Sequence, residues 1–408
     1  MLGSIQAEMT STAGPIETHG PGHLRAARRV VFLGVFGPPS LTFARSCHAR
    51  GIAVYLLIPG AVGDAPGIQS SCFAGVEVLD SETVGEPRGI EAILAYLRRV
   101  GAEALATIAD TNCLWLARNQ VKFEGVCKLL VPPIECLDLI DSKMRQIALA
   151  QEAGFRVLPT RLIRGASDVA SIEPEHYPVC LRPAARNAVE PPFKVAKANS
   201  AEDLLHYIRD AWNLRDALIA QPFRVLPNLI VHCSSREGGE LIYAQAFLAD
   251  RKFEGLALRI RAMPLPDGLA DPIRKFSRSA GLSGAYHFDF LYAPQSKEAY
   301  FLEVNARFGG TTDKVFWLGV DEPADCLVAY GLQPSQPRRR FHTRRAVVNK
   351  RATLKHLLTM IHRGPEPWDF PQESRITGAL HSLADLLWAK DSIWDYRDLK
   401  GSLAFHLQ

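Results

Sequence analysis

Two neighbouring segments, GAYHFDF (284–290) and FLEVNARFGG (301–310), carry apolar or aromatic side chains at every second position. This is the period of a β-strand, in which successive side chains point to opposite faces. The aromatic residues of the first segment are therefore expected to face a core. Residues 294–297 between the segments are typical of a turn and predict that the two strands form a hairpin.

The second segment has an unusual distribution of polar groups. Its alternation predicts two faces: Phe301, Glu303, Asn305 and Arg307 on one, and Leu302 and Val304 on the other. An exposed hairpin with one polar face would have the same spacing. An acid, an amide and a guanidinium that share a face and end at a Gly-Gly turn favour a ligand site.

If the hairpin brings its polar rows together, Asp289, Glu303 and Asn305 converge as oxygen ligands. A set of oxygen ligands suits a hard cation such as Mg²⁺, which needs few protein ligands when phosphates supply the others. Arg307 could then hold a phosphate or an anionic intermediate through two parallel hydrogen bonds.

Composition describes an ordinary globular chain. The length of 408 residues suggests about two to four domains or lobes, and a composition that is 47% hydrophobic provides enough apolar side chains for their cores. The net charge of +4 suits an anionic small substrate as well as a nucleic acid. The eight cysteines form no C-x-x-C pair, and no apolar run approaches the ~20 residues of a membrane span. We therefore expect reduced thiols, a cytoplasmic location and no membrane partner.

The order of predicted elements divides the chain into five parts. Residues 1–27 are rich in Gly, Pro, Ser and Thr and predict a disordered tail. Strand–helix–strand patterns over 28–135 predict an α/β domain with an open parallel sheet, whereas irregular alternation over 136–330 predicts α+β lobes. A Pro- and Arg-rich linker is expected at 331–345, followed by a small C-terminal extension at 346–408.

At this point the hairpin resembles a known superfamily. FLEVNARFGG resembles the E-x-N-x-R strand of ATP-grasp proteins of the carboxylate–amine ligase and biotin-carboxylase-like branch, and FDF resembles the acidic strand before it. The resemblance covers about 28–330. It implies a pre-ATP-grasp domain at 28–135 and an ATP-grasp domain at 136–330, with a lid at about 155–215. It also implies ATP with Mg²⁺, or Mn²⁺ in its place, as cofactors on the metal ligands Asp289, Glu303 and Asn305.

The resemblance further implies a nucleotide site. Its residues would be Lys143, Arg182, Gln221, Phe223 and Asn228. Three of these depart from the usual pattern, because Arg182 stands for a lysine, Gln221 for a glutamate and Asn228 for an acidic residue. The family's glycine-rich flap would fall at 185–199, where this chain has no glycine.

Two groups of basic residues allow more than one role on sequence alone. The resemblance implies catalytic roles for Arg307 and for Arg259, which shares a strand face with Arg261 and could point toward a phosphate or a carboxylate substrate. An exposed basic strand would look the same. The cluster of Arg and Lys at 338–355 lacks an aromatic stacking pattern, so a solvated face is favoured over a nucleic-acid contact.

The reaction implied by the resemblance is ATP-dependent ligation. A small carboxylate would be activated as an acyl-phosphate and coupled to an amine, with release of ADP and phosphate. Two alternatives stay open: a carboxylase or formyl-transfer enzyme that activates a one-carbon acid, and a nucleotide-binding module without turnover. Family members often dimerise, so a homodimer also stays open.

Overall fold

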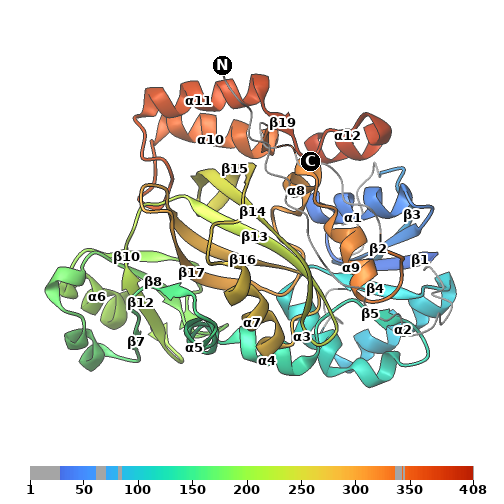
Figure 1. Ribbon diagram of the computed structural model, residues 1–408, viewed down its shortest axis with the longest axis horizontal. Coiled ribbons are helices and arrows are strands. Elements are labelled where there is room, and N and C mark those ends of the chain that lie inside the picture. Colours follow the sequence, from blue (N-terminus) through green and yellow to red (C-terminus); the bar gives the residue numbers. More distant parts are fainter. Residues whose placement is uncertain (1–27, 61–69, 81–84, 336–341, 343–344, 408) are drawn as a thin grey trace, which may run out of the picture.

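The computed structural model describes residues 28–60, 70–80, 85–335, 342 and 345–407 (Figure 1). The predicted tail at 1–27 and much of the predicted linker therefore lie outside the described residues. Within them, the chain combines helices with four β-sheets, which confirms the mixed α/β content. None of the helices in these ranges is both long and apolar enough to cross a membrane.

The N-terminal domain is built on a five-stranded sheet whose paired strands are all parallel. Its strands, in spatial order, are β3 (Phe73–Asp80), β2 (Ala53–Gly60), β1 (Arg29–Leu33), β4 (Ala104–Thr107) and β5 (Lys128–Leu129). Helices cover both faces of this sheet, so β1 is buried on both sides. Phe32 packs against Phe43 of α1 (Pro38–His48) on one face, and Leu33 shares a core with α2 (Pro87–Val100) on the other. Two further helices, α3 (Asp110–Arg118) and α4 (Ile134–Asp141), complete this part.

A small antiparallel sheet forms a separate lobe at residues 161–222, overlapping the predicted lid. Its strands are β10 (Ala196–Ala198), β8 (Val179–Pro183), β12 (Leu218–Pro222) and β7 (Arg161–Ile163). A core of its own lies between this sheet and α6 (Ala201–His206), and a short pair, β9 (Val189–Glu190) with β11 (Asn213–Leu214), lies beside it. The lobe is at the lower left of Figure 1.

The centre of the molecule is an eight-stranded sheet. In spatial order its strands are β19 (Lys390–Asp391), β18 (Ala346–Val348), β15 (Leu256–Met263), β14 (Glu240–Phe253), β13 (Asn228–Arg236), β16 (Gly284–Ala293), β17 (Glu298–Asn305) and β6 (Arg156–Val157). Helices α5 (Lys143–Ala153) and α7 (Ala270–Ala280) pack on one face, and α8 (Thr312–Leu318) and α9 (Glu322–Ala329) pack on the other.

The predicted hairpin is β16 and β17, and its aromatic face is buried as expected. Phe288 and Phe290 are fully buried and contact Phe155, Phe276 and Phe301 in one aromatic cluster. Because these rings are large and fully desolvated, they fix the sheet against α5 and α7. The polar side of the same two strands is left for the cleft described below.

The predicted faces of the second strand are partly wrong. Phe301 lies in the core together with Val304, whereas Leu302 lines the cleft together with Glu303. The cause is a β-bulge: Asp289 pairs with Glu303, but the next residue, Phe290, pairs with Phe301. One extra residue on β17 therefore exchanges the faces at that point, as bulges do.

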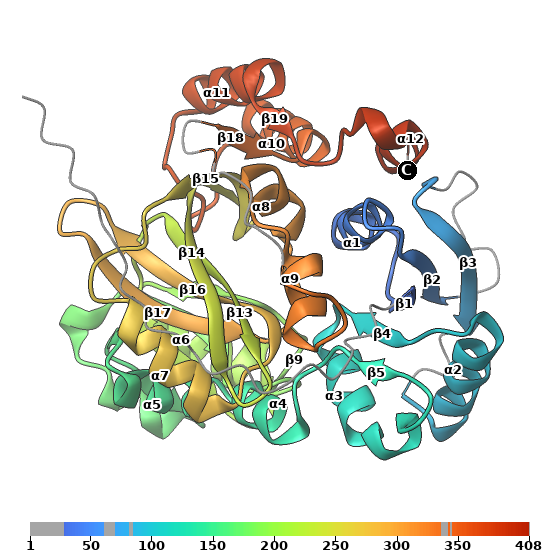
Figure 2. The same cartoon turned by 45° about the vertical axis from the view of Figure 1, so that its right-hand side comes forward.

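Residues after 345 are integrated with both preceding parts. Strands β18 and β19 extend the central sheet, and α10 (Lys350–His362) and α11 (Arg375–Trp388) pack together beyond β15 (Figure 1). The last helix, α12 (Leu399–Leu407), lies beside α1 of the N-terminal domain (Figure 2).

A buried ion pair fixes this last contact. Arg45 of α1 donates from Nε to Asp398 Oδ2 at 2.9 Å, and its Nη1 donates to the carbonyl oxygen of Ile393 at 2.7 Å. Ser70 also donates to Asp398, whose side chain is only 1% exposed. Both charges are therefore compensated within the protein.

We predict that Asp398→Ala lowers the thermal unfolding temperature strongly, because it leaves the Arg45 guanidinium buried without its partner. Removing one partner of such a pair costs about 3–5 kcal/mol. Differential scanning fluorimetry measures the effect. The control is Glu77→Ala, which removes an exposed partner of Arg99 and should cost no more than about 1 kcal/mol. Equal shifts for the two variants would contradict the prediction.

Candidate active site

A cleft of about 1020 Å³ lies between the small lobe and the central sheet. Its walls come from β8 and β12 on one side and from β13, β16 and β17 on the other, with α5 at one end. The C-terminal part contributes Asn349, Lys355 and Trp368. A cavity of this size with many polar groups is large enough for a nucleotide and a small substrate.

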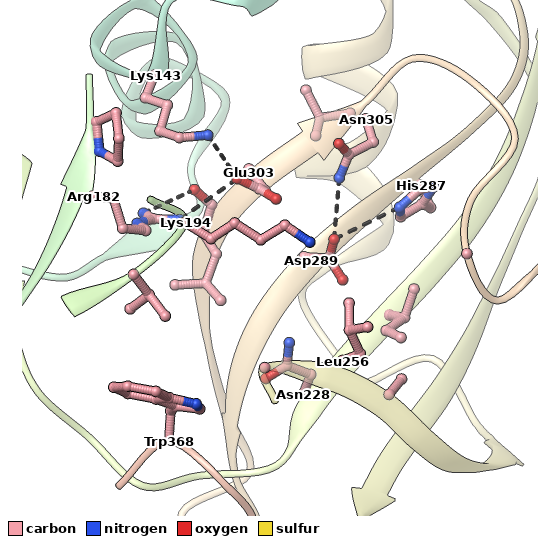
Figure 3. Close-up of a pocket in the computed structure, with 18 of the residues that line it drawn as sticks. Lys143, Arg182, Lys194, Asn228, Leu256, His287, Asp289, Glu303, Asn305 and Trp368 are labelled. Carbon is pink, nitrogen blue, oxygen red and sulfur yellow. Dashed lines mark hydrogen bonds and ion pairs between the residues drawn. The ribbon is translucent and has the colours of Figure 1, made fainter. Parts of the chain in front are cut away.

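Two carboxylates face each other across the hairpin. Asp289 on β16 and Glu303 on β17 are register partners, and Asn305 Nδ2 donates to Asp289 Oδ2 at 3.2 Å (Figure 3). The structure thus brings together the three residues predicted as metal ligands.

The environment gives the two acids opposite proton affinities. Burial and the neighbouring Glu303 carboxylate raise the pKa of Asp289 to about 7. Burial acts on Glu303 in the same direction, but the Lys143 ammonium and the Arg182 guanidinium outweigh it and lower the pKa of Glu303 to about 2. Protein cations therefore compensate Glu303, whereas at Asp289 burial and the Glu303 charge outweigh the attraction of His232 and Arg307. A divalent cation beside Asp289 would supply the missing positive charge, so the donor set fits Mg²⁺.

Two basic side chains form ion pairs with Glu303. Lys143, the first residue of α5, lies 2.9 Å from Glu303 Oε2, and Arg182 Nη1 lies 3.6 Å from the same oxygen (Figure 3). Arg182 also donates from Nη2 to Gln221 Oε1 at 2.9 Å. Ser142 places Lys143 by capping α5, since its side chain accepts from the backbone of Arg145. Phosphate oxygens could replace Glu303 as the partner of both cations.

The remaining predicted nucleotide residues line the far end of the cleft. Phe223 follows β12, and its backbone N–H donates to the carbonyl oxygen of Pro178 at 2.8 Å. Asn228 Oδ1 accepts from Lys252 at 3.1 Å. Burial lowers the pKa of Lys252 to about 8. Sequence analysis missed this lysine, because nothing in its neighbourhood marks it as buried in a polar site.

Arg307 is fixed by a residue of the N-terminal domain. Its Nε and Nη2 lie 2.6 and 3.0 Å from the two carboxylate oxygens of Asp110, the first residue of α3. This bidentate pair holds the guanidinium at the cleft wall. The role of Asp110 was missed because 197 positions separate the two residues.

Arg259 is the predicted catalytic residue that the structure places apart from the others. Its side chain does not line the cleft but lies 3.6 Å from Asp250 and 3.4 Å from Asp385 of α11. These acids occupy the guanidinium in a network between β15 and the C-terminal helices. The alternating pattern around Arg259 predicted a strand, and β15 lies there. The same local pattern carries no information about Asp385 on α11.

The segment without glycine, 185–199, does lie along the cleft. Lys194 extends from it toward the space between Glu303 and Asp289 (Figure 3), and Arg186 pairs with Asp141 at 3.1 Å. Of the basic cluster at 338–355, Lys355 pairs with Glu254, and several other members lie outside the described ranges.

Comparison by sequence gives no match to any family or to any curated protein. Comparison of structures gives clear matches at low identity. The ADP complex of the PurK N5-carboxyaminoimidazole ribonucleotide synthetase superposes with a TM-score of 0.62 at 12% identity, over 89% of this chain and 97% of that one. The corresponding synthetase from Staphylococcus aureus gives 0.59 at 12% identity, over 85% and 90%.

A third match is the biotin carboxylase domain of 2-oxoglutarate carboxylase from Hydrogenobacter thermophilus, in complex with MgADP, ADP and bicarbonate. Its TM-score is 0.61 at 15% identity, over 79% of this chain and 74% of that one. All three neighbours are ATP-grasp proteins, and the first two cover most of both chains. The resemblance found in the hairpin is confirmed at the level of the fold: this chain has the ATP-grasp fold.

Proposed function

We propose that the protein is an ATP- and Mg²⁺-dependent ligase that activates a small carboxylate as an acyl-phosphate and couples it to an amine. The observation that carries this proposal is the group formed by Asp289, Glu303, Lys143 and Arg182 in one cleft. It combines oxygen ligands for a cation with two cations for phosphate, which phosphoryl transfer requires.

Each group has a distinct task in the proposed reaction. Bound Mg²⁺, or Mn²⁺ in its place, would offset charge on the phosphate oxygens. Lys143 and Arg182 would leave Glu303 and hold the triphosphate. Phe223 and Asn228 would contact the nucleoside. Arg307, held rigid by Asp110, would orient the acid and stabilise its acyl-phosphate. The amine then attacks the acyl carbon, and phosphate leaves.

The neighbours favour one alternative acid. Two of them are carboxyaminoimidazole synthetases, and the third holds bicarbonate. Bicarbonate could therefore take the place of the larger carboxylate, which would make the product a carbamate. Incorporation of labelled bicarbonate or formate distinguishes this alternative. ATP binding without ADP release for any acid and amine would instead favour a binding module. We also propose a cytoplasmic location, since all eight cysteines are free thiols.

A homodimer is proposed on the basis of α11. Its outward side carries apolar residues at intervals of four, three and four positions, which are 46 to 74% exposed: Ile376, Leu380, Leu383 and Leu387. The opposite side of the helix is buried. This spacing is that of a coiled-coil seam, and two copies related by a two-fold axis would bury each other's seam.

We predict that Asp289→Asn and Glu303→Gln each lower ADP release by about 10²- to 10³-fold, because each removes charge from the site that would bind the cation. Coupled ADP assays over a panel of amino acids and amines measure this. Glu298→Gln on the same strand is the control, since that residue contacts Arg156 away from the cleft and should change little. Wild-type rates in both cleft variants would overturn the metal assignment.

We predict that Arg182→Lys weakens ATP binding by about tenfold, because a lysine cannot contact Gln221 and a phosphate with one fixed planar group. Isothermal titration with ATP and Mg²⁺ measures the dissociation constant. Arg156→Lys, at an exposed guanidinium, serves as the control. An unchanged constant for Arg182→Lys would mean that only the positive charge at this position matters.

We predict that the double variant Leu380→Glu, Leu383→Glu is monomeric, because four like charges would face each other across the two-fold seam. Light scattering after size exclusion measures the mass. Val121→Glu, at an exposed valine in the N-terminal domain, should leave the dimer intact. A wild-type protein that is monomeric at every concentration would contradict the proposal.

A further inference from the structure

A buried chain of hydrogen bonds leads from the interior to the wall of the cleft. His232 of β13 lies with Nδ1 2.6 Å from Glu322 Oε1 and with Nε2 3.0 Å from Thr311 Oγ1. His232 and Glu322 are 0% exposed, whereas Thr311 is 7% exposed and lines the cleft. The three side chains thus form a line that ends at the substrate space.

The surrounding contacts fix the direction of each hydrogen bond. Glu322 Oε2 accepts from Thr312 Oγ1 at 2.5 Å, and that hydroxyl in turn accepts from the backbone N–H of Gly309 at 3.0 Å. Because a carboxylate can only accept, Glu322 Oε1 accepts from His232 Nδ1, and in the neutral imidazole this nitrogen carries the proton. Its Nε2 is then free to accept from the Thr311 hydroxyl. The lone pairs of Thr311 are left for a donor in the cleft.

This line ends close to the proposed reaction centre. His232 is the register partner of His287, and the two rings stack with centroids 5.3 Å apart. His287 Nε2 lies 3.6 Å from Asp289 Oδ2. Thr311 directly follows Gly309-Gly310, four positions after Arg307, and both Thr311 and Arg307 line the cleft. The ionisable groups nearest His232 are Glu322 from α9 and His287 from β16, with Asp289 and Arg307 beyond them.

We propose that Thr311 is a catalytic residue that accepts a proton from the amine substrate, with His232 and Glu322 as positioning residues. This inference rests on the proposed ligase function. As the amine nitrogen forms its bond to the acyl carbon, the carbon–oxygen bond to phosphate breaks and phosphate leaves. The amine proton passes to Thr311 Oγ1, and the threonine's own proton passes to His232 Nε2. Glu322 stabilises the resulting imidazolium.

A purely structural network would behave differently in one measurable way. Hydroxylamine is largely uncharged and strongly nucleophilic at neutral pH, and the nitrogen of its adduct is acidic enough to lose its proton to water, so it attacks an acyl-phosphate without help from a base. An alkylamine is an alkylammonium ion at this pH and its adduct is a weaker acid, so its attack depends on a base that takes the proton. The proposed relay is therefore needed for amide formation but not for hydroxamate formation, whereas a loss of structure would affect both.

The experiment compares Thr311→Val and Thr311→Ser with the wild type. The acid is the one that gives hydroxamate with hydroxylamine in a screen of the amino acids, and the amine is the one that then gives most amide. Thr311→Val should lower the rate of amide formation by about 10²- to 10⁴-fold and leave the rate of hydroxamate formation unchanged. Thr311→Ser, which keeps the hydroxyl, should restore amide formation. His232→Gln should resemble Thr311→Val, with loss of amide formation and unchanged hydroxamate formation.

Three results would overturn the inference. Equal losses of hydroxamate and amide in Thr311→Val would indicate a structural role, as would failure of Thr311→Ser to restore amide formation in a protein with a wild-type unfolding temperature. Unchanged amide formation in Thr311→Val would exclude the relay directly. Absence of hydroxamate from the wild type with every acid, by contrast, would contradict the acyl-phosphate chemistry itself, and the relay would fall with it.

Discussion

The carboxylate of Glu303 joins three parts of the molecule. It lies on β17 of the central sheet and pairs with Lys143 at the start of α5 and with Arg182 on β8 of the small lobe. One negative charge thus compensates two positive charges, which leaves a net positive cleft wall. Together with burial, which has the larger effect, the same acid raises the pKa of the neighbouring Asp289 to about 7. A triphosphate would compensate the excess positive charge of Lys143 and Arg182, and a divalent cation would compensate Asp289. The two ligands are therefore expected to bind cooperatively.

Local patterns were enough to predict most of the elements that carry this site. The alternation over 284–290 predicts a strand with a buried aromatic face, and β16 has that face. The proximity of Asp289 and Glu303 follows from the same reasoning, since a hairpin with a short turn must bring its polar rows together. These features depend on residues close in sequence, where period and turn chemistry act directly.

The features that could not be predicted depend on contacts between residues far apart in the sequence. The bulge at Leu302 has no local signal, because both Phe301 and Leu302 are apolar and either could face the core. Arg259 has the charge expected of a substrate contact, yet its guanidinium forms an ion pair with Asp385 of α11. The bidentate partner of Arg307 lies in another domain. In each case a contact between residues distant in sequence, and not the local pattern, determines where the side chain lies.

The contribution of the C-terminal part to the cleft has a consequence for biosynthesis. Asn349, Lys355 and Trp368 line the binding space, and β18 and β19 extend the sheet on which it is built. The hairpin that carries Asp289 and Glu303 is therefore synthesised before the walls around it are complete. A nascent chain that exposes the acidic pair and its cations has no enclosed site to protect a reactive intermediate from water. Competence for the proposed chemistry must then arise after translation has passed these residues, as a late event in the folding of the whole chain.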